Sequence, residues 1–290
     1  MRGCIQVSIF LAAGICVAQS AAAFGPEGHR LVGEIAEYHL CADARREIDL
    51  LLDGESLARA GSWPDWIRGR SEWAHTRPWH YINVDDEAPV PEGRAQDGAA
   101  DELPERGDVL WAIGYFDQRF ADSTRAGEER AEALRFLAHF IADVHQPLHV
   151  GREKDRGGNA IGVRVDGRQT NLHSVWDAQA LLKAARPAGR DGRQSQLQAV
   201  FGLTAGRLAA LQAHAPGAWA RESMALRPVV YAFGPALGGA DIDLEPAYLA
   251  GALEIIYQRL SEAGVRLAGR INRVYCAPAP SRSALEPLSR

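Results

Sequence analysis

The chain has 290 residues, with 32 Lys and Arg against 37 Asp and Glu, which gives a formal net charge of −5 at pH 7. This mildly acidic balance argues against a continuous basic groove of the kind that grips long duplex DNA, so any affinity for a polyanion must be local. No low-complexity linker divides the sequence, and we therefore expect one domain over residues 24–290.

The first 23 residues have the pattern of a secretory signal peptide. A basic residue precedes an apolar run over 5–17, and three alanines at 21–23 end the segment with small side chains. The apolar run is shorter than the ~20 residues that a membrane-spanning helix needs, and the bulky Ile15 before Cys16 does not fit a lipid-attachment signal. We expect cleavage after Ala23 and a secreted or periplasmic monomer without stable membrane association.

Apolar residues recur with helical spacing in four later parts of the chain, which predicts an α-rich fold. These residues are Leu31, Ile35 and Tyr38; Leu110, Ile113, Phe116 and Phe120; Leu134, Leu137, Phe140 and Ile141; and Leu249, Leu253, Ile256, Leu260, Leu267 and Ile271.

Two other segments have different patterns. The stretch from Val84 to Glu105 is rich in Pro, Gly, Asp and Ala and has no period, which predicts a long surface loop, either functional or disordered. The run NAIGVRVDGRQT alternates Val163 and Val165 with polar residues before an Asp166-Gly167 turn, and it predicts a small β-hairpin.

Two cysteines, Cys41 and Cys276, remain once the leader is removed. They could pair in an oxidising compartment, although the sequence alone does not show that they are close. Two cysteines cannot form a thiolate metal cluster.

The densest group of polar residues with metal-binding potential lies in the run RFLAHFIADVHQPLHVGREKDRGGN. His139 and Asp143 are spaced i, i+4, so both side chains project from one face of a helix and suit a shared metal ion. Pro147 should end that helix, which leaves His149 free to approach from another direction.

A second pair with the same spacing, His173 and Asp177, lies in NLHSVWDAQALL. A lone buried histidine is usually a hydrogen-bonded core residue, but two His-x-x-x-Asp pairs together favour a metal site. Asp65 in SWPDWIR and His80 in WHYIN lie among tryptophans, and Asp65 could alternatively cap a short helix.

The remaining histidines have no comparable neighbours. For His145 we expect a structural role or a role that supports the metal ligands, because Pro147 disrupts helical pairing with His149. His39, His75 and His214 are expected to be surface or hydrogen-bonded residues.

Together these motifs resemble the S1/P1 nuclease family of zinc-dependent phosphodiesterases, whose fold is shared with bacterial zinc phospholipase C. The resemblance runs through FGPEGH, SWPDWIR, WHYIN, FLAHFIADVHQPLH, GGN and NLHSVWD, and thus covers nearly all of residues 24–290. It implies an all-α, single-domain phospholipase C/P1 nuclease-like fold with a small β-hairpin, and three zinc ions per chain.

The resemblance also implies the ligands of each ion. One zinc would be held by Asp65, His80, His139 and Asp143. A second would be held by His29, by Asp143, which bridges the two ions, and by Phe24 through the amine and carbonyl of a trimmed N-terminus. The third would be held by His149, His173 and Asp177. All the donors are nitrogen or oxygen, which suits zinc.

The implied activity is that of a zinc-dependent endonuclease and 3′-nucleotidase. Such an enzyme hydrolyses single-stranded DNA and RNA to 5′-phosphorylated products and removes phosphate from 3′-nucleotides. The catalytic residues would be Asp65, Asp143 and Arg68, where Arg68 stabilises charge on the phosphoryl oxygens unless it only forms a surface salt bridge.

In substrate binding, Tyr81 would stack on an unpaired base. Asn83 stands where several relatives carry an aspartate that contacts the base edge, so their base preference does not carry over. Alternatively, Tyr81 and Asn83 could both pack against neighbouring side chains without contacting a substrate.

Two other functions remain open at this point. A zinc phospholipase C of the same fold would use the same chemistry on a lipid, but such enzymes carry a glutamate where this chain has Asp177. A secreted zinc-binding protein without turnover is the other alternative, against which Arg68 and Tyr81 argue.

Overall fold

The computed structural model describes residues 24–92, 107–183, 203–233 and 242–276. The predicted leader, residues 93–105 of the predicted loop, and residues 277–290 lie outside these ranges. Residues 84–92 contain no helix or strand, as the loop prediction requires. Within the described ranges, no helix combines the length and hydrophobicity needed to cross a bilayer.

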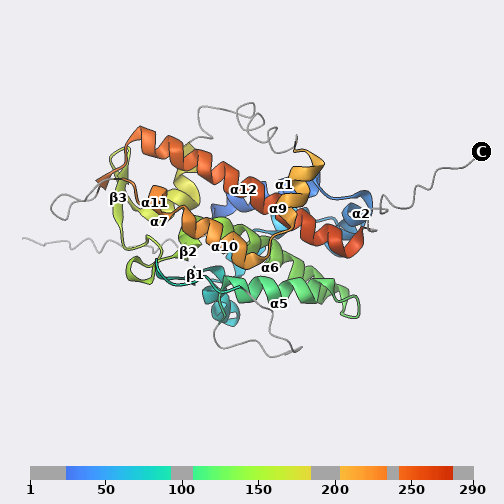
Figure 1. The fold of residues 1–290 in the computed structure, drawn as a ribbon. Coiled ribbons are helices and arrows are strands. Elements are labelled where there is room, and N and C mark those ends of the chain that lie inside the picture. Colours follow the sequence, from blue (N-terminus) through green and yellow to red (C-terminus); the bar gives the residue numbers. More distant parts are fainter. Residues whose placement is uncertain (1–23, 93–106, 184–202, 234–241, 277–290) are drawn as a thin grey trace, which may run out of the picture.

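Helices make up most of the described chain, in agreement with the predicted fold class (Figure 1). The longer ones are α1 (Gly25–Tyr38), α2 (Ala42–Leu51), α5 (Val109–Ala121), α6 (Gly127–His145), α9 (Ala205–Gln212), α10 (Pro216–Ala225) and α12 (Pro246–Tyr275). Short helical segments connect them: α3 (Leu57–Ala60), α4 (Trp63–Ile67), η1 (Ser71–His80), η2 (Pro147–His149), η3 (Glu153–Asp155), α7 (Leu172–Ser174), η4 (Val175–Gln179) and α11 (Arg227–Val230).

The helix boundaries follow from local sequence. Proline occupies the first turn of α1, α4, α10, α11 and α12, where its missing N–H group costs no hydrogen bond. Asp108 caps α5 by accepting the N–H groups of Leu110 and Trp111, both at 2.9 Å. Helix α6 ends at His145, two residues before Pro147, as predicted.

Helix α6 is the centre of the fold. Every residue from Phe136 to His145 is buried, and the helix packs against α1, α5, α10 and α12, which surround it in Figure 1. Phe136 stacks on Phe116 of α5, with ring centroids 4.5 Å apart. The predicted apolar positions lie in this core except Tyr38, which is 54% exposed at the last turn of α1, and Leu253, which is only partly buried.

Helix α1 packs closely against α3 and α12 because a glycine stands at each contact: Gly33 in α1 itself and Gly264 in α12. A Cβ atom at Gly33 would lie 2.4 Å from the backbone nitrogen of Ala58, and one at Gly264 would lie 2.5 Å from Cγ2 of Ile35. Neither position accepts a side chain, so the backbones approach closely there. This packing places the buried His29 of α1 beside α6.

The predicted hairpin is present as β3 (Gly162–Val165) and β4 (Arg168–Asn171), which pair antiparallel. Its turn residues, Asp166 and Gly167, both have positive φ, as a two-residue hairpin turn requires. Two strand pairings were not predicted. Strand β5 (Ile242–Asp243) pairs parallel with β3, and β1 (Ile82–Asn83) pairs parallel with β2 (Val150–Gly151).

The two cysteines whose pairing the sequence left open form a disulfide. Cys41, the N-cap residue of α2, joins Cys276, which directly follows α12, with Cα atoms 6.4 Å apart. The side-chain oxygen of Asn272 also accepts the N–H of Cys41 at 3.0 Å. The N-terminal helices are thus tied to the end of α12.

Candidate metal centre

Four side chains converge where α6 passes the short helices α4 and η1. Within α6, Nε2 of His139 lies 3.3 Å from Oδ2 of Asp143, as the i, i+4 spacing predicted. Nδ1 of His80, at the end of η1, lies 2.9 Å from Oδ2 of Asp143 and 3.0 Å from Nε2 of His139. Oδ1 of Asp65, in α4, lies 3.8 Å from Nε2 of His139. Ligands bound tetrahedrally at ~2.0–2.1 Å from zinc are ~3.3 Å apart, so this spacing suits one ion.

The second carboxylate oxygen of Asp143 faces a different histidine. Oδ1 of Asp143 lies 3.5 Å from Nε2 of His29, and Oδ2 of Asp65 lies 4.0 Å from the same nitrogen. The rings of His29 and His139 stack with centroids 3.9 Å apart. Asp143 therefore lies between two donor sets, as the predicted bridge requires. Asp65 also faces both sets, which the sequence did not predict.

Phe24 begins the described chain and is fully buried. Its φ of 41° is left-handed, and its carbonyl accepts the N–H of Gly28 at 3.0 Å, which starts α1. A Cβ atom at Gly25 would contact Ala178 and the carbonyl of Asp177, so the start of α1 packs against η4. The predicted metal ligand at the N-terminus thus lies next to the chain that carries Asp177.

A third donor set combines His149, His173 and Asp177. Nε2 of His173 lies 3.1 Å from Oδ2 of Asp177, and Nε2 of His149 lies 3.8 Å from Oδ1 of Asp177. His149, in η2 beyond Pro147, faces these two residues rather than the His139–Asp143 pair, as predicted. The i, i+4 pairing of His173 with Asp177 is present, although Val175–Gln179 is a π-helical segment rather than a regular α-helix. Single π turns often occur at functional sites.

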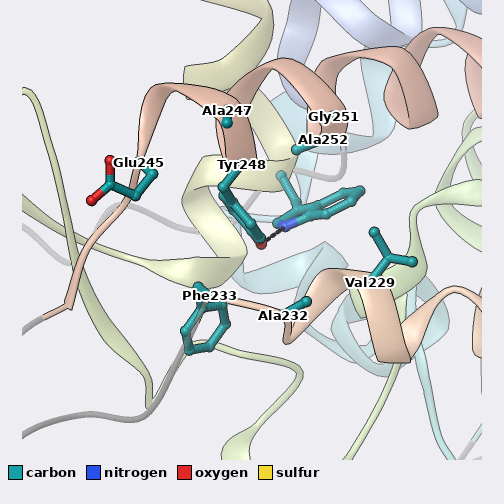
Figure 2. A pocket seen from close by; sticks show the side chains of 9 residues that line it. Val229, Ala232, Phe233, Glu245, Ala247, Tyr248, Gly251 and Ala252 are labelled. Atoms are coloured by element: carbon teal, nitrogen blue, oxygen red, sulfur yellow. Dashed lines mark hydrogen bonds between the residues drawn. The ribbon is translucent and has the colours of Figure 1, made fainter.

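Trp176 anchors η4, the segment that carries Asp177, to helix α12. Its indole Nε1 donates to the hydroxyl of Tyr248 in α12 at 2.9 Å, and that hydroxyl donates to the carbonyl of Val230 at 2.6 Å. Figure 2 shows the hydrogen bond to Tyr248 beside a cavity that Phe233 and Val229 also line. Because Trp176 precedes Asp177 directly, this contact fixes where the carboxylate can point.

Backbone carbonyls orient three of the histidines. Nδ1 of His139 lies 2.7 Å from the carbonyl of Gly61, and Nδ1 of His149 and of His173 each lie 2.6 Å from the carbonyls of His80 and Gly157. A carbonyl only accepts hydrogen bonds, so each Nδ1 must carry the proton, and the Nε2 lone pair of the neutral ring points to the donor set. Gly157 has positive φ, and a Cβ there would lie 2.6 Å from the carbonyl of Leu148. The GGN motif therefore includes a carbonyl that orients His173, a predicted metal ligand.

Several donor atoms in these sets lack hydrogen bonds to any described residue. Among them are Oδ1 of Asp143, Nε2 of His149 and Oδ2 of Asp177, all buried. Leaving buried polar atoms unsatisfied is costly, and a cation would satisfy all three. The side chains present therefore fit ions that take nitrogen and oxygen ligands, zinc among them.

Burial shifts the pKa values of these ligands. It raises the pKa of Asp143 to about 6, although the nearby His139 lowers it, and it lowers the pKa of His149 to about 3. For His139, burial also lowers the pKa, but the carboxylates of Asp143 and Asp65 outweigh it and the net pKa is raised. His149 is therefore neutral at pH 7, the form that binds metal.

Gln146 is a site residue that the sequence analysis missed. Its Nε2 donates to Oδ1 of Asp177 at 2.5 Å, and its Oε1 accepts the N–H of Leu148 at 2.5 Å. The amide therefore turns Oδ2 of Asp177 toward the third donor set and fixes the turn before His149. Its place between His145 and Pro147, inside the ligand motif, was the available signal.

His145 is held in a buried polar network, in agreement with its predicted structural role. Nδ1 lies 2.6 Å from the carbonyl of Ile141, and Nε2 accepts from Arg266 of α12 at 2.7 Å, so both ring nitrogens are engaged. The carbonyls that end α6 are also satisfied, because Ser223 donates to Val144 and Arg259 donates to His145. Of the described residues, the donor sets include neither His145 nor His39, His75 or His214.

The residues predicted to contact substrate lie around these sets. Arg68 is mostly buried, with Nη1 3.3 Å from Oδ1 of Asp65. Tyr81 is 43% exposed and, with Asn83, lines a cavity of about 340 Å³. The same cavity is lined by Gly157, whose carbonyl orients His173. The structure therefore places Tyr81 and Asn83 beside the third donor set.

Comparison with known proteins agrees with this geometry. The model of the S1/P1 nuclease family matches residues 24–276, the part that holds all three donor sets. The chain belongs to the S1/P1 nuclease family. This nuclease is 31% identical to Endonuclease 2 of Arabidopsis thaliana over 278 residues, which cover 87% of this chain and 90% of the relative. It is 32% identical to Endonuclease 4 of the same plant, over 87% of this chain and 89% of the relative. It is 28% identical to Nuclease P1 of Penicillium citrinum, over 87% of this chain and 98% of the relative.

Proposed function

We propose that this nuclease is a secreted or periplasmic enzyme that binds three zinc ions and hydrolyses single-stranded DNA and RNA to 5′-phosphorylated products. We further propose that it removes phosphate from 3′-nucleotides. The observation that carries the proposal is the position of Asp143, whose two oxygens face separate donor sets 2.9–3.5 Å away. A bridged metal pair with a third ion nearby is suited to phosphodiester hydrolysis.

Each donor set has a defined role in this proposal. The sets around Asp143 would hold two ions, with Phe24 completing the set of His29, and His149, His173 and Asp177 would hold the third. Bound zinc would supply a nucleophile from water near neutral pH and offset the charge of the departing oxygen. Membership of the family supports hydrolysis of phosphoester bonds.

The protein's own side chains position the substrate and hold charge. The guanidinium of Arg68 lies beside Asp65, so a phosphate at the donor sets would meet a fixed positive charge that stabilises its oxygens in the transition state. The exposed ring of Tyr81 offers a face on which an unpaired base can stack. A base held within a duplex cannot reach that ring, which supports the preference for single strands.

The test compares four substrates before and after treatment with EDTA. We expect hydrolysis of single-stranded DNA, RNA and 3′-AMP that EDTA abolishes and zinc restores. Faster turnover of phosphatidylcholine would instead support the phospholipase alternative. If no phosphoester is hydrolysed while zinc is still bound, the protein is a zinc-binding protein without turnover.

A further inference from the structure

One cavity beside the donor sets has charged side chains to which the proposed reaction gives no role. Its lining combines the strand after His80 with the turn that follows β2, and its volume of about 340 Å³ is within the ~300–1,000 Å³ typical of small-molecule sites. The lining residues are Tyr81, Asn83, Leu148, Glu153, Arg156, Gly157 and Asn159. A molecule in this cavity would lie next to the third donor set.

The polar groups of the cavity are open to a ligand. Among the described residues, the side chains of Glu153 and Arg156 make no hydrogen bond or ion pair, although only two residues separate them. Nδ2 of Asn159 donates to the carbonyl of Arg156 at 2.9 Å, which fixes the turn. One exposed ring, a carboxylate and a guanidinium therefore border the same space.

We propose that Glu153 and Arg156 make guanine the preferred base in this cavity, beside the stacking ring of Tyr81. The inference rests on the proposed nuclease function, because the phosphate must be held at the donor sets for the base to reach the cavity. Tyr81 supplies the stacking surface, which serves every base. Selection then depends on the groups that face the base edge.

Guanine is the base whose edge matches both charges. It carries two neighbouring N–H donors, at N1 and N2, that a carboxylate accepts together, and two acceptors, O6 and N7, that a guanidinium binds. Adenine presents an acceptor at N1, which a carboxylate repels. Cytosine offers one donor group beside acceptors, and uracil has a single donor between two acceptors. With these bases Glu153 or Arg156 would remain incompletely paired.

The experiment uses the zinc-loaded enzyme, the variants Glu153→Gln and Arg156→Gln, and Lys154→Gln as a matched control. Lys154 lies in the same exposed turn but does not line the cavity. Values of kcat/KM are measured for 3′-GMP, 3′-AMP, 3′-CMP and 3′-UMP. The wild type should prefer 3′-GMP to 3′-AMP by ~10-fold or more. Glu153→Gln should remove this preference mainly through KM, and Lys154→Gln should retain it.

A binding measurement separates this inference from the proposed function. Calorimetry with 5′-GMP and 5′-AMP needs no turnover, and 5′-GMP should bind more tightly to the wild type and to Lys154→Gln but not to Glu153→Gln. If no 3′-nucleotide is hydrolysed yet 5′-GMP binding depends on Glu153, the proposed activity is wrong and the base assignment stands. If the wild type binds both nucleotides equally, or if Glu153→Gln weakens every base to the same extent, the base assignment is overturned.

Discussion

Asp143 is the side chain on which the metal centre depends most, because its two oxygens face His29 on one side and His80 and His139 on the other. We expect Asp143→Asn to lower kcat by ~10³-fold or more and to reduce the bound zinc, since the amide removes a charge shared by two ions. Asp166→Asn, in the exposed hairpin turn, is the control. Elemental analysis that finds three zinc ions in Asp143→Asn, together with near-normal turnover, would refute the bridging role.

A second prediction at the level of one residue concerns the α-amine of Phe24 as a zinc ligand. If the leader is cut after Ala23, the free α-amine has a pKa of ~7.7–8.0 and gives up its proton to zinc at modest cost, whereas the amide of an extended chain is a poor ligand. A protein with residues added before Phe24 should therefore lose the bridged metal pair and most of its activity. It should keep one zinc at His149, His173 and Asp177. Three zinc ions and full activity in the extended protein would contradict this role of Phe24.

The two His-x-x-x-Asp pairs of the site could be predicted from sequence spacing, whereas the grouping of the other residues was implied by the family resemblance. The i, i+4 spacing and the helix stop at Pro147 predicted that His139 and Asp143 lie together and that His149 approaches from another direction, whereas the grouping of His149 with other residues was implied by the family resemblance. Spacing could not reveal contacts that depend on main-chain atoms from distant segments, such as the carbonyl of Gly61 on His139. The side-chain amide of Gln146 was missed because glutamine is not itself a zinc ligand type.

At the scale of elements, α10 and α12 hold the C-terminal end of α6 through a charged network. Glu222 of α10 accepts from Arg266 at 2.7 and 2.8 Å and from Arg259 at 2.8 Å, and these arginines also contact His145. Burial raises the pKa of Glu222, but the hydrogen bonds from Arg266 and Arg259 lower it more, to about 2. Ionised Glu222 therefore favours the folded state.

The sign of this shift gives a pH prediction. Because the folded pKa lies below the ordinary value of 4.5, the stabilisation is complete above pH ~4.5 and is lost as the pH falls toward 2. Glu222→Gln should lower the free energy of unfolding by about 1–2 kcal/mol at pH 7, a figure reduced because the side chain is partly exposed to solvent. The difference from wild type should nearly vanish at pH 2. Urea unfolding in EDTA measures this without zinc binding, with Glu254→Gln on the exposed face of α12 as control. An equal loss at both pH values would show that the charge is not responsible.

Element prediction was accurate where a pattern extended over several turns. Helices α1, α5, α6 and α12 and the hairpin all contain the expected periodic residues. The β1–β2 pair and β5 were missed because two-residue strands have no detectable alternation. Tyr38 also lies in a helix, as its spacing predicted, but it is exposed, because it stands at the end of α1, where the neighbouring helices no longer cover it.

On the scale of the whole molecule, the proposed metal ligands come from α1, α4, η1, α6, η2, α7 and η4. We expect zinc to stabilise the entire fold, because ions that bind the native state alone shift the unfolding equilibrium toward it. At ~100 times the dissociation constant each ion adds ~2.7 kcal/mol, so chelation should lower Tm by ~10 °C or more. Calorimetry with EDTA, followed by added zinc or magnesium, measures the effect. A Tm that does not change after verified zinc removal would contradict it.

Helix α12 contributes no residue to the donor sets of the described chain, yet its thirty residues cover α1, hold the end of α6 through Arg259, and end at the disulfide to Cys41. A polypeptide still being synthesised lacks this helix until every segment that carries a donor residue has already been made. If RNA is a substrate, as proposed, the growing chain should be unable to attack the message and the ribosomal RNA that surround it, since its donor residues are not yet held in place. The order of the helices along the gene would then delay activity until α12 is made, without a separate inhibitor.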